Sequence, residues 1–229
     1  GMTGMKPKVW IALGTQFLVF AGLLFGSAGT LAWPAAWVFL VLFFGSGALI
    51  TRALARDDPA LLEERMKPLI QKGQPLWDKI IVESFVVLFA FWLILTGLDA
   101  GRFHWAAVPV GLRSVGAAGI LVSMWICSRT VQANPFLAVV VKIQAERGHE
   151  VATKGPYGFV RHPLYAAMLV LLLSSALLLG SRLGLAAAIP LAGELILRTA
   201  LEDRELHRRL DGYADYARRV RYRLVPQLW

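Results

Sequence analysis

Six long apolar segments, separated by polar stretches, dominate the hydrophobic pattern of the chain. They cover residues 10–31, 35–50, 80–98, 105–127, 164–179 and 183–197. A helix needs about 20 apolar residues to cross the ~30 Å hydrocarbon core of a bilayer, so the first, third and fourth segments are long enough and the other three are short. The pattern predicts an all-α, polytopic integral membrane bundle of about five to six transmembrane helices.

Two of the connections are tight. Trp33-Pro34 joins the first two segments, and Gly180-Ser181-Arg182 joins the last two. Such short connections are typical of antiparallel helical hairpins. Segment 183–197 either spans fully or enters the membrane obliquely, and in both cases we expect it to continue as a cytoplasmic C-terminal helical tail.

Composition narrows the class of protein. Of 229 residues, 57% are hydrophobic and 17% are charged, whereas soluble domains are about 45–50% apolar and about 25% charged. A soluble enzyme, a disordered chain and a coiled coil are therefore excluded. Residues 1–229 are expected to form one membrane domain, with a four-span region at 1–127 and a functional core at 128–229. The single cysteine, Cys127, allows no intramolecular disulfide.

The balance of charge is basic, and its distribution is uneven. The net charge is +9, from 24 Lys and Arg against 15 Asp and Glu. With six spans, one side holds the N-terminus and residues 51–79, 128–163 and 198–229, which together carry 21 of the 24. The positive-inside rule then places both termini in the cytoplasm, with a bacterial-type inner membrane as the location, and the excess charge indicates contact with anionic lipid rather than nucleic acid.

Candidate chemistry begins in the polar stretch at 134–165. Gly155-Pro156-Tyr157-Gly158 is a turn by composition. Pro163 suits the first position of a helix, which puts His162 at the cap and Tyr165 near one face of the first turn. An imidazole, a phenol and free backbone N–H groups would thus lie together at the membrane surface, although either side chain alone is also typical of an ordinary interfacial residue.

The last segment supplies charges at the same level. Arg198, Glu202 and Glu205 fall near one helix face, where they form either a solvated surface with i,i+4 ion pairs or a binding site. Because the helix emerges from an apolar run, its first charges lie where the membrane ends. A carboxylate there could hold the ammonium group of one ligand, and an arginine an anionic or carbonyl group of another.

The other polar positions are less specific. The short stretch after Asp57-Asp58-Pro59 is amphipathic and is interpreted as a helix on the lipid headgroups, with a substrate-binding role as the alternative. Glu83 and Glu194 lie inside apolar runs near a cytoplasmic end, where they either face a cavity or reach the interface. No metal-ligand spacing, nucleophile elbow or phosphate loop is present in the sequence.

Taken in order, GPYGFVRHPLY, R-x-x-x-E-D-x-x-L, G-Y-x-x-Y and an Arg-rich V-P tail resemble the isoprenylcysteine carboxyl methyltransferase family, which is related to membrane phospholipid methyltransferases. The resemblance covers about residues 134–229. It implies a helical membrane bundle that transfers a methyl group from S-adenosylmethionine, taken from the cytosol, to a hydrophobic or lipid-borne acceptor in the bilayer.

The resemblance also implies residue roles. Arg198 would bind the polar group of the acceptor, and Glu202 would bind the amino end of the cofactor. The remaining cofactor contacts would be Gln144, His149, Glu150, Val151, Ala152, Tyr157, His162, Pro163, Leu164 and Tyr165. The sequence departs from the family in having Asp203 in place of a second glutamate and a shorter stretch from Gln144 to His149.

Methyl transfer is an in-line displacement, so positioning of the two reactants can supply much of the acceleration, and no metal is needed. A general base is required only for an acceptor that must lose a proton, and none is assigned. Prenylcysteine carboxylates, lipid amines and small thiols all remain open as acceptors. Two other functions remain open as well: an NADPH-dependent membrane reductase of the sterol type, and a non-catalytic membrane scaffold or transporter.

Overall fold

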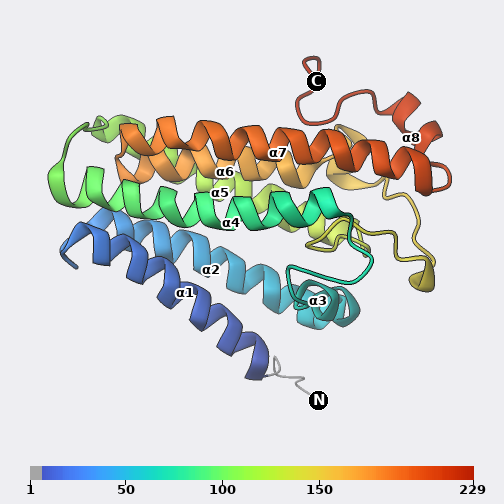
Figure 1. Cartoon of the computed structure of the whole chain (residues 1–229), viewed down its shortest axis with the longest axis horizontal. Helices are drawn as coiled ribbons and strands as arrows, with labels where there is room; N and C mark the ends of the chain where they lie inside the picture. The colour runs from blue at the N-terminus through green and yellow to red at the C-terminus, as the bar shows by residue number, and fades with distance from the viewer. Residues whose placement is uncertain (1–6) are drawn as a thin grey trace.

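A computed structural model describes residues 7–229 as an elongated bundle whose long helices run along a common axis (Figure 1). Between them lie short helices and turns, and the described residues form no β-strand. In chain order the elements are α1 (Pro7–Ala28), α2 (Pro34–Asp57), α3 (Pro59–Arg65), α4 (Leu76–Thr96), the π-helix η1 (Gly97–Phe103), α5 (Val110–Ala133), the 3-10 turns η2 (Ala145–Arg147) and η3 (Gly155–Gly158), α6 (Pro163–Leu179), α7 (Arg182–Arg209) and α8 (Tyr213–Arg219).

The polytopic all-α architecture predicted from the hydrophobic pattern is confirmed. Five helical stretches in the described residues are long and apolar enough to cross a membrane: α1, α2, α4 with η1, α5 and α7. The expectation that segments 35–50 and 183–197 are short is wrong, because each lies inside a longer helix, of 24 and 28 residues. Both helices continue beyond their apolar segments through charged residues. Long basic side chains at the end of a span can reach water, so such residues are tolerated there.

Only α6 remains short, with 17 residues that rise about 25 Å. It begins at Pro163, as predicted, and ends at Gly180, whose φ of 82° terminates the helix. The Ser181 hydroxyl then accepts a hydrogen bond from the Gly184 N–H at 2.7 Å and starts α7. From there α7 runs without a break to Arg209, so the apolar run and the charged tail helix are one element.

The core lies between α1, α2, α4 and the pair α5–α6. Trp92 is fully buried there, and its indole N–H donates to the Gly184 carbonyl at 2.8 Å. Small residues bring α5 and α6 together: a Cβ on Gly116 would lie 2.5 Å from the Leu178 nitrogen. The backbones of these two helices are therefore in direct contact, which places the start of α6 firmly relative to α5.

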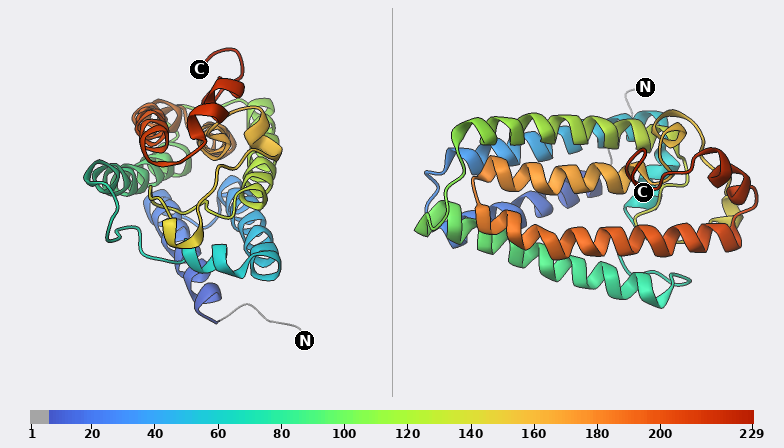
Figure 2. Two further views of the ribbon diagram at one scale, coloured as in Figure 1. Left: turned by 90° about the vertical axis from the view of Figure 1, so that its right-hand side faces the viewer. Right: turned by 90° about the horizontal axis from the view of Figure 1, so that it is seen from above.

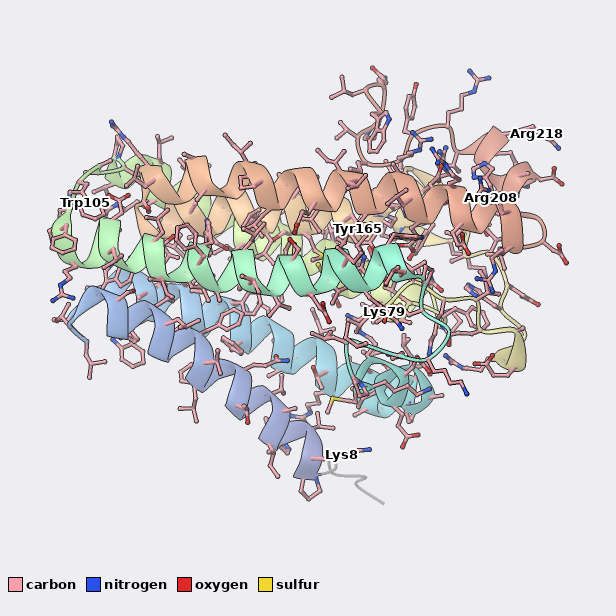
Figure 3. All side chains as sticks on the ribbon, viewed as in Figure 1. Lys8, Lys79, Trp105, Tyr165, Arg208 and Arg218 are labelled. Atoms are coloured by element: carbon pink, nitrogen blue, oxygen red, sulfur yellow. The ribbon has the colours of Figure 1, made fainter. Side chains whose placement is uncertain are left out.

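The two ends of the bundle differ in character. One end, called here the polar end, comprises α3, residues 134–162 and α8, and the start of α1 and the C-terminus lie on this side (Figure 2). Lys8, Lys79, Arg208 and Arg218 lie toward it, whereas Trp105 marks the opposite end (Figure 3). The division of the chain at residue 127 is not a structural boundary, because α5 runs through it.

Candidate functional site

A cavity of about 200 Å³ lies at the polar end, between the 134–152 loop, η3, the first turns of α6, and the charged parts of α7 and α8. Nine of the eleven predicted cofactor contacts line it, and so does Arg198. Those nine residues are His149, Glu150, Val151, Ala152, Tyr157, His162, Leu164, Tyr165 and Glu202. Gln144 and Pro163 do not line it. The residues singled out from motifs thus converge, from three separate stretches of chain, on one site.

At the polar end of the contact between α6 and α7, the Tyr165 hydroxyl donates a hydrogen bond to the Glu202 carboxylate at 2.5 Å. Tyr165 is buried, and Figure 3 places it inside the bundle, near the level where charged side chains begin. Arg198 lies over the Tyr165 ring, with its Cζ 5.6 Å from the centroid. Glu202 forms no ion pair with any described residue, and it lines the cavity.

Arg198 is held by Asp78, a residue that sequence reasoning missed. Arg198 Nε donates to Asp78 Oδ1 at 2.8 Å, and its Nη2 donates to the Val139 carbonyl at 2.8 Å. Asp78 is fully buried and also accepts from the Gln74 side chain at 2.7 Å and from the Val141 N–H at 2.9 Å. One carboxylate at the start of α4 therefore fixes both Arg198 and one wall of the cavity.

Asp203 is the second carboxylate that organises the site. It accepts from Arg161 at 2.8 and 3.0 Å, from Tyr213 at 2.8 Å and from Arg223 at 2.9 Å, and His162 Nε2 lies 3.1 Å away. Burial lowers the pKa of Arg161, but its bonds to Asp203 outweigh this effect and raise it. His162 is at the N-cap of α6, as predicted, with its ring turned to Asp203 rather than to the helix N–H groups.

Gln144 is buried within the loop. Its amide donates to the Phe136 carbonyl at 2.7 Å and accepts from Arg147 at 2.5 Å, while its backbone N–H donates to His149 Nδ1 at 3.3 Å. His149 in turn stacks on Phe136 with 4.7 Å between the centroids. Burial and the charge of Arg147 lower the pKa of His149. Gln144 thus shapes the loop that forms one wall of the cavity.

Tyr157 belongs to η3, the turn predicted at 155–158. Its hydroxyl accepts from the Asn134 amide at 2.9 Å, and its carbonyl accepts from the Tyr216 hydroxyl at 2.7 Å. The aromatic side chains of α8 are buried against it, so α8 closes one side of the cavity.

The interpretation of α3 as a helix on the headgroups is corrected. Leu61 is fully buried against Leu54 and Val131, and Arg65 lines the cavity and donates from Nη1 to the Leu137 carbonyl at 2.9 Å. The helix therefore packs on the 134–152 loop. Of the two glutamates in apolar runs, Glu194 accepts a hydrogen bond from Ser84, and neither lines the cavity.

The family comparison agrees with this geometry. Residues 118–208 match the model of the Isoprenylcysteine carboxyl methyltransferase (ICMT) family. The resemblance noted in the sequence is thereby confirmed for this segment, which is similar to a family of membrane methyltransferases. No curated protein matches the chain.

The ICMT match covers part of the site only. It includes the 134–152 loop, α6, and α7 to within one residue of its end, and thus Arg198, Glu202 and Asp203. It leaves out α3, the start of α4, and α8, which contribute Arg65, Asp78, Tyr213 and Tyr216 to the cavity or its supports. Arg65 and Asp78 are not found from sequence motifs, because they lie in elements with no recognisable pattern of their own, whereas Tyr213 and Tyr216 are the two tyrosines of the G-Y-x-x-Y motif.

Proposed function

We propose that this protein is an integral membrane methyltransferase that moves a methyl group from S-adenosylmethionine to a hydrophobic or lipid-borne acceptor. The observation that carries the proposal is the Glu202 carboxylate, which is oriented by Tyr165, has no ion-pair partner among the described residues, and faces a cavity built largely from the ICMT-matched segment. A carboxylate in that state is suited to bind an ammonium group.

The lining fits the other parts of such a cofactor. When bound, the cofactor would supply a methyl group carried on a sulfonium. Glu202 would hold its ammonium, while His149, Tyr157 and the backbone of residues 150–152 would enclose its nucleoside. Because the transfer is an in-line displacement, the task of these residues is to fix the position of one reactant relative to the other. Gln144 and Pro163 would act indirectly, by shaping the loop and starting α6.

The acceptor is proposed to come from the bilayer. Leu164 and Met168, on successive turns of α6, line the same cavity as the charged groups, so it has an apolar side directed into the bundle. Arg198 keeps guanidinium N–H groups beyond those bonded to Asp78 and Val139, and these could bind the polar group of the acceptor. A prenylcysteine-type carboxylate, or a lipid amine whose headgroup also carries a phosphate, would meet both features.

The size of the cavity sets a further condition. At about 200 Å³ it is smaller than the ~300–1,000 Å³ of sites that enclose a ligand of drug size. A cofactor and a lipid acceptor would therefore extend through its open side or shift the 134–152 loop. Entry of the cofactor from water at the polar end agrees with a cytoplasmic location of that end.

The first test is calorimetric titration of S-adenosylmethionine and its demethylated product into detergent-purified protein. Wild type should bind at micromolar concentration, and Glu202→Gln should weaken binding at least tenfold, or about 1.4 kcal/mol. Glu205→Gln is the matched control, because Glu205 lies one turn further along α7, pairs with Arg209 and does not line the cavity.

Absence of binding in wild-type protein that elutes as a single folded species would contradict the proposal, and NADPH would be titrated next. If the cofactor binds, transfer of a radiolabelled methyl group to a prenylcysteine, a lipid amine and a small thiol identifies the acceptor class. Transfer only to the soluble thiol would contradict a lipid-borne acceptor and leave the cofactor assignment intact.

A further inference from the structure

The cavity contains one positive charge that the protein does not neutralise. Four Lys and Arg side chains line the cavity: Arg65, Lys142, Arg161 and Arg198. The last three each form an ion pair with a carboxylate of the chain. Within residues 7–229, Arg65 forms none; its one hydrogen bond to the protein goes to the Leu137 carbonyl.

Arg65 is also partly removed from water. Its guanidinium is part-buried between α3 and the 134–152 loop, and this desolvation lowers its pKa. A buried cation without a counterion is costly unless a partner is supplied, and a bidentate carboxylate is the partner that a guanidinium fork fits best. A ligand that places an anionic group beside Arg65 would therefore offset the desolvation cost of its unpaired guanidinium.

Arg65 and Glu202 act on the same region of the cavity. Burial raises the pKa of the Tyr157 phenol, and among the smaller effects the negative charge of Glu202 raises it further while the positive charge of Arg65 lowers it. Both side chains also line the same cavity as Tyr157. A free carboxylate and a free guanidinium around one cavity are complementary to a zwitterion whose two charges are carried on the same carbon.

We propose that Arg65 binds the α-carboxylate of S-adenosylmethionine in the cavity where Glu202 binds its α-ammonium. This inference rests on the proposed function and deepens it, because it assigns the second half of the amino-acid subsite to α3. That helix lies outside the ICMT-matched segment. The N-terminal half of the chain would then contribute directly to cofactor binding.

The test compares two ligands that differ only in the carboxylate, S-adenosylmethionine and its decarboxylated analogue. Both are titrated by calorimetry into wild type and Arg65→Gln in detergent. Wild type should prefer the carboxylate-bearing ligand. Arg65→Gln should weaken S-adenosylmethionine at least tenfold and leave the decarboxylated analogue within about twofold, which abolishes the preference.

Three further variants make the comparison specific. Glu202→Gln should weaken both ligands, since both retain the ammonium group. Arg56→Gln should change neither, because Arg56 is an exposed arginine at the end of α2, paired with Asp57 and away from the cavity. Arg65→Lys, which keeps the charge but not the fork, should retain part of the preference.

Equal weakening of both ligands in Arg65→Gln would overturn the inference, since it would show that Arg65 only supports the loop through Leu137. Unchanged binding of both ligands would also overturn it and place the carboxylate elsewhere. If wild type binds neither ligand, the proposed function itself fails, an outcome distinct from failure of the Arg65 assignment alone.

Discussion

Asp203 shows how a single buried carboxylate can organise the site. Its two oxygens receive hydrogen bonds from the loop before α6, from α8 and from the C-terminal tail. Removal of one member of a buried charged network leaves the others without a partner, which costs about 3–5 kcal/mol. Asp203 therefore has a structural task that Glu202, its neighbour in sequence, does not share.

The variant Asp203→Asn should accordingly lower the stability of the protein more than a typical substitution does. Loss of the negative charge leaves Arg161 and Arg223 without their counterion, so the melting temperature in detergent should fall by several degrees. Asp215→Asn, in an exposed pair with Arg218, should leave it nearly unchanged. Equal melting temperatures for the two variants would show that Asp203 is not a structural centre.

At the scale of single residues, the sequence motifs and the helical periodicity predicted that Tyr165 and Glu202 lie near each other. Each residue has a defined position on a helix that emerges at the membrane surface. The partners Asp78 and Arg65 were not predictable in the same way. Asp78 and Arg198 are 120 positions apart, and no local period links them. Their pairing depends on how α4, α3 and α7 are arranged in space.

Among the elements, α5 and α6 form the closest contact in the bundle. Small residues between Gly111 and Gly119 allow close helix packing, and Gly116 and Gly119 both meet α6. This contact holds α6 in place, and the first turn of α6 carries His162, Leu164 and Tyr165 to the cavity.

Gly116→Ala should therefore separate the two helices. Its Cβ would meet the Leu178 nitrogen at 2.5 Å and the Ser174 carbonyl at 2.6 Å, and backbone atoms cannot rotate away. Overpacking of this kind costs about 1–3 kcal/mol. Gly111→Ala, on the same helix with no atom within 4 Å of the added Cβ, is the matched control and should be neutral or stabilising. Thermal melting of both variants tests this expected loss of stability. A Gly116→Ala protein as stable as the Gly111→Ala protein would contradict a tight contact between the backbones of α5 and α6.

Element boundaries were predictable where a local signal exists. Pro163 marked the start of α6, and Gly180 its end. The π-helix η1 was not foreseen, because its polar residues suggested a loop after residue 98. Asp99 is instead buried and bonded to the Ser181 hydroxyl at 2.6 Å and the Ala106 N–H at 3.0 Å, so remote partners allow it to stay inside a helix.

In the whole molecule, the antiparallel arrangement brings the start of α1, the C-terminus, most of the basic charge and the cavity to one end. A cofactor from water and an acceptor from lipid can meet only where the two phases adjoin. The polar end provides such a place, because the charged half of α7 and the apolar start of α6 border the same cavity.

Orientation follows from the charge distribution. Of the 23 Lys and Arg residues in the described part of the chain, only Arg102, Arg113 and Arg182 lie at the end opposite the cavity, so the positive-inside rule predicts a cytoplasmic polar end. This can be tested with single-cysteine variants on a Cys127→Ser background, at Lys8, Trp105 and Arg218 (Figure 3). In spheroplasts of a bacterial host, a membrane-impermeant maleimide should label Trp105→Cys at once, and Lys8→Cys and Arg218→Cys only after permeabilisation.

The same labelling behaviour at Lys8→Cys and Arg218→Cys requires an even number of membrane crossings between them, which makes α6 a span despite its 17 residues. Labelling of Arg218→Cys in intact spheroplasts would place the cavity outside the cell, away from a cytosolic methyl donor.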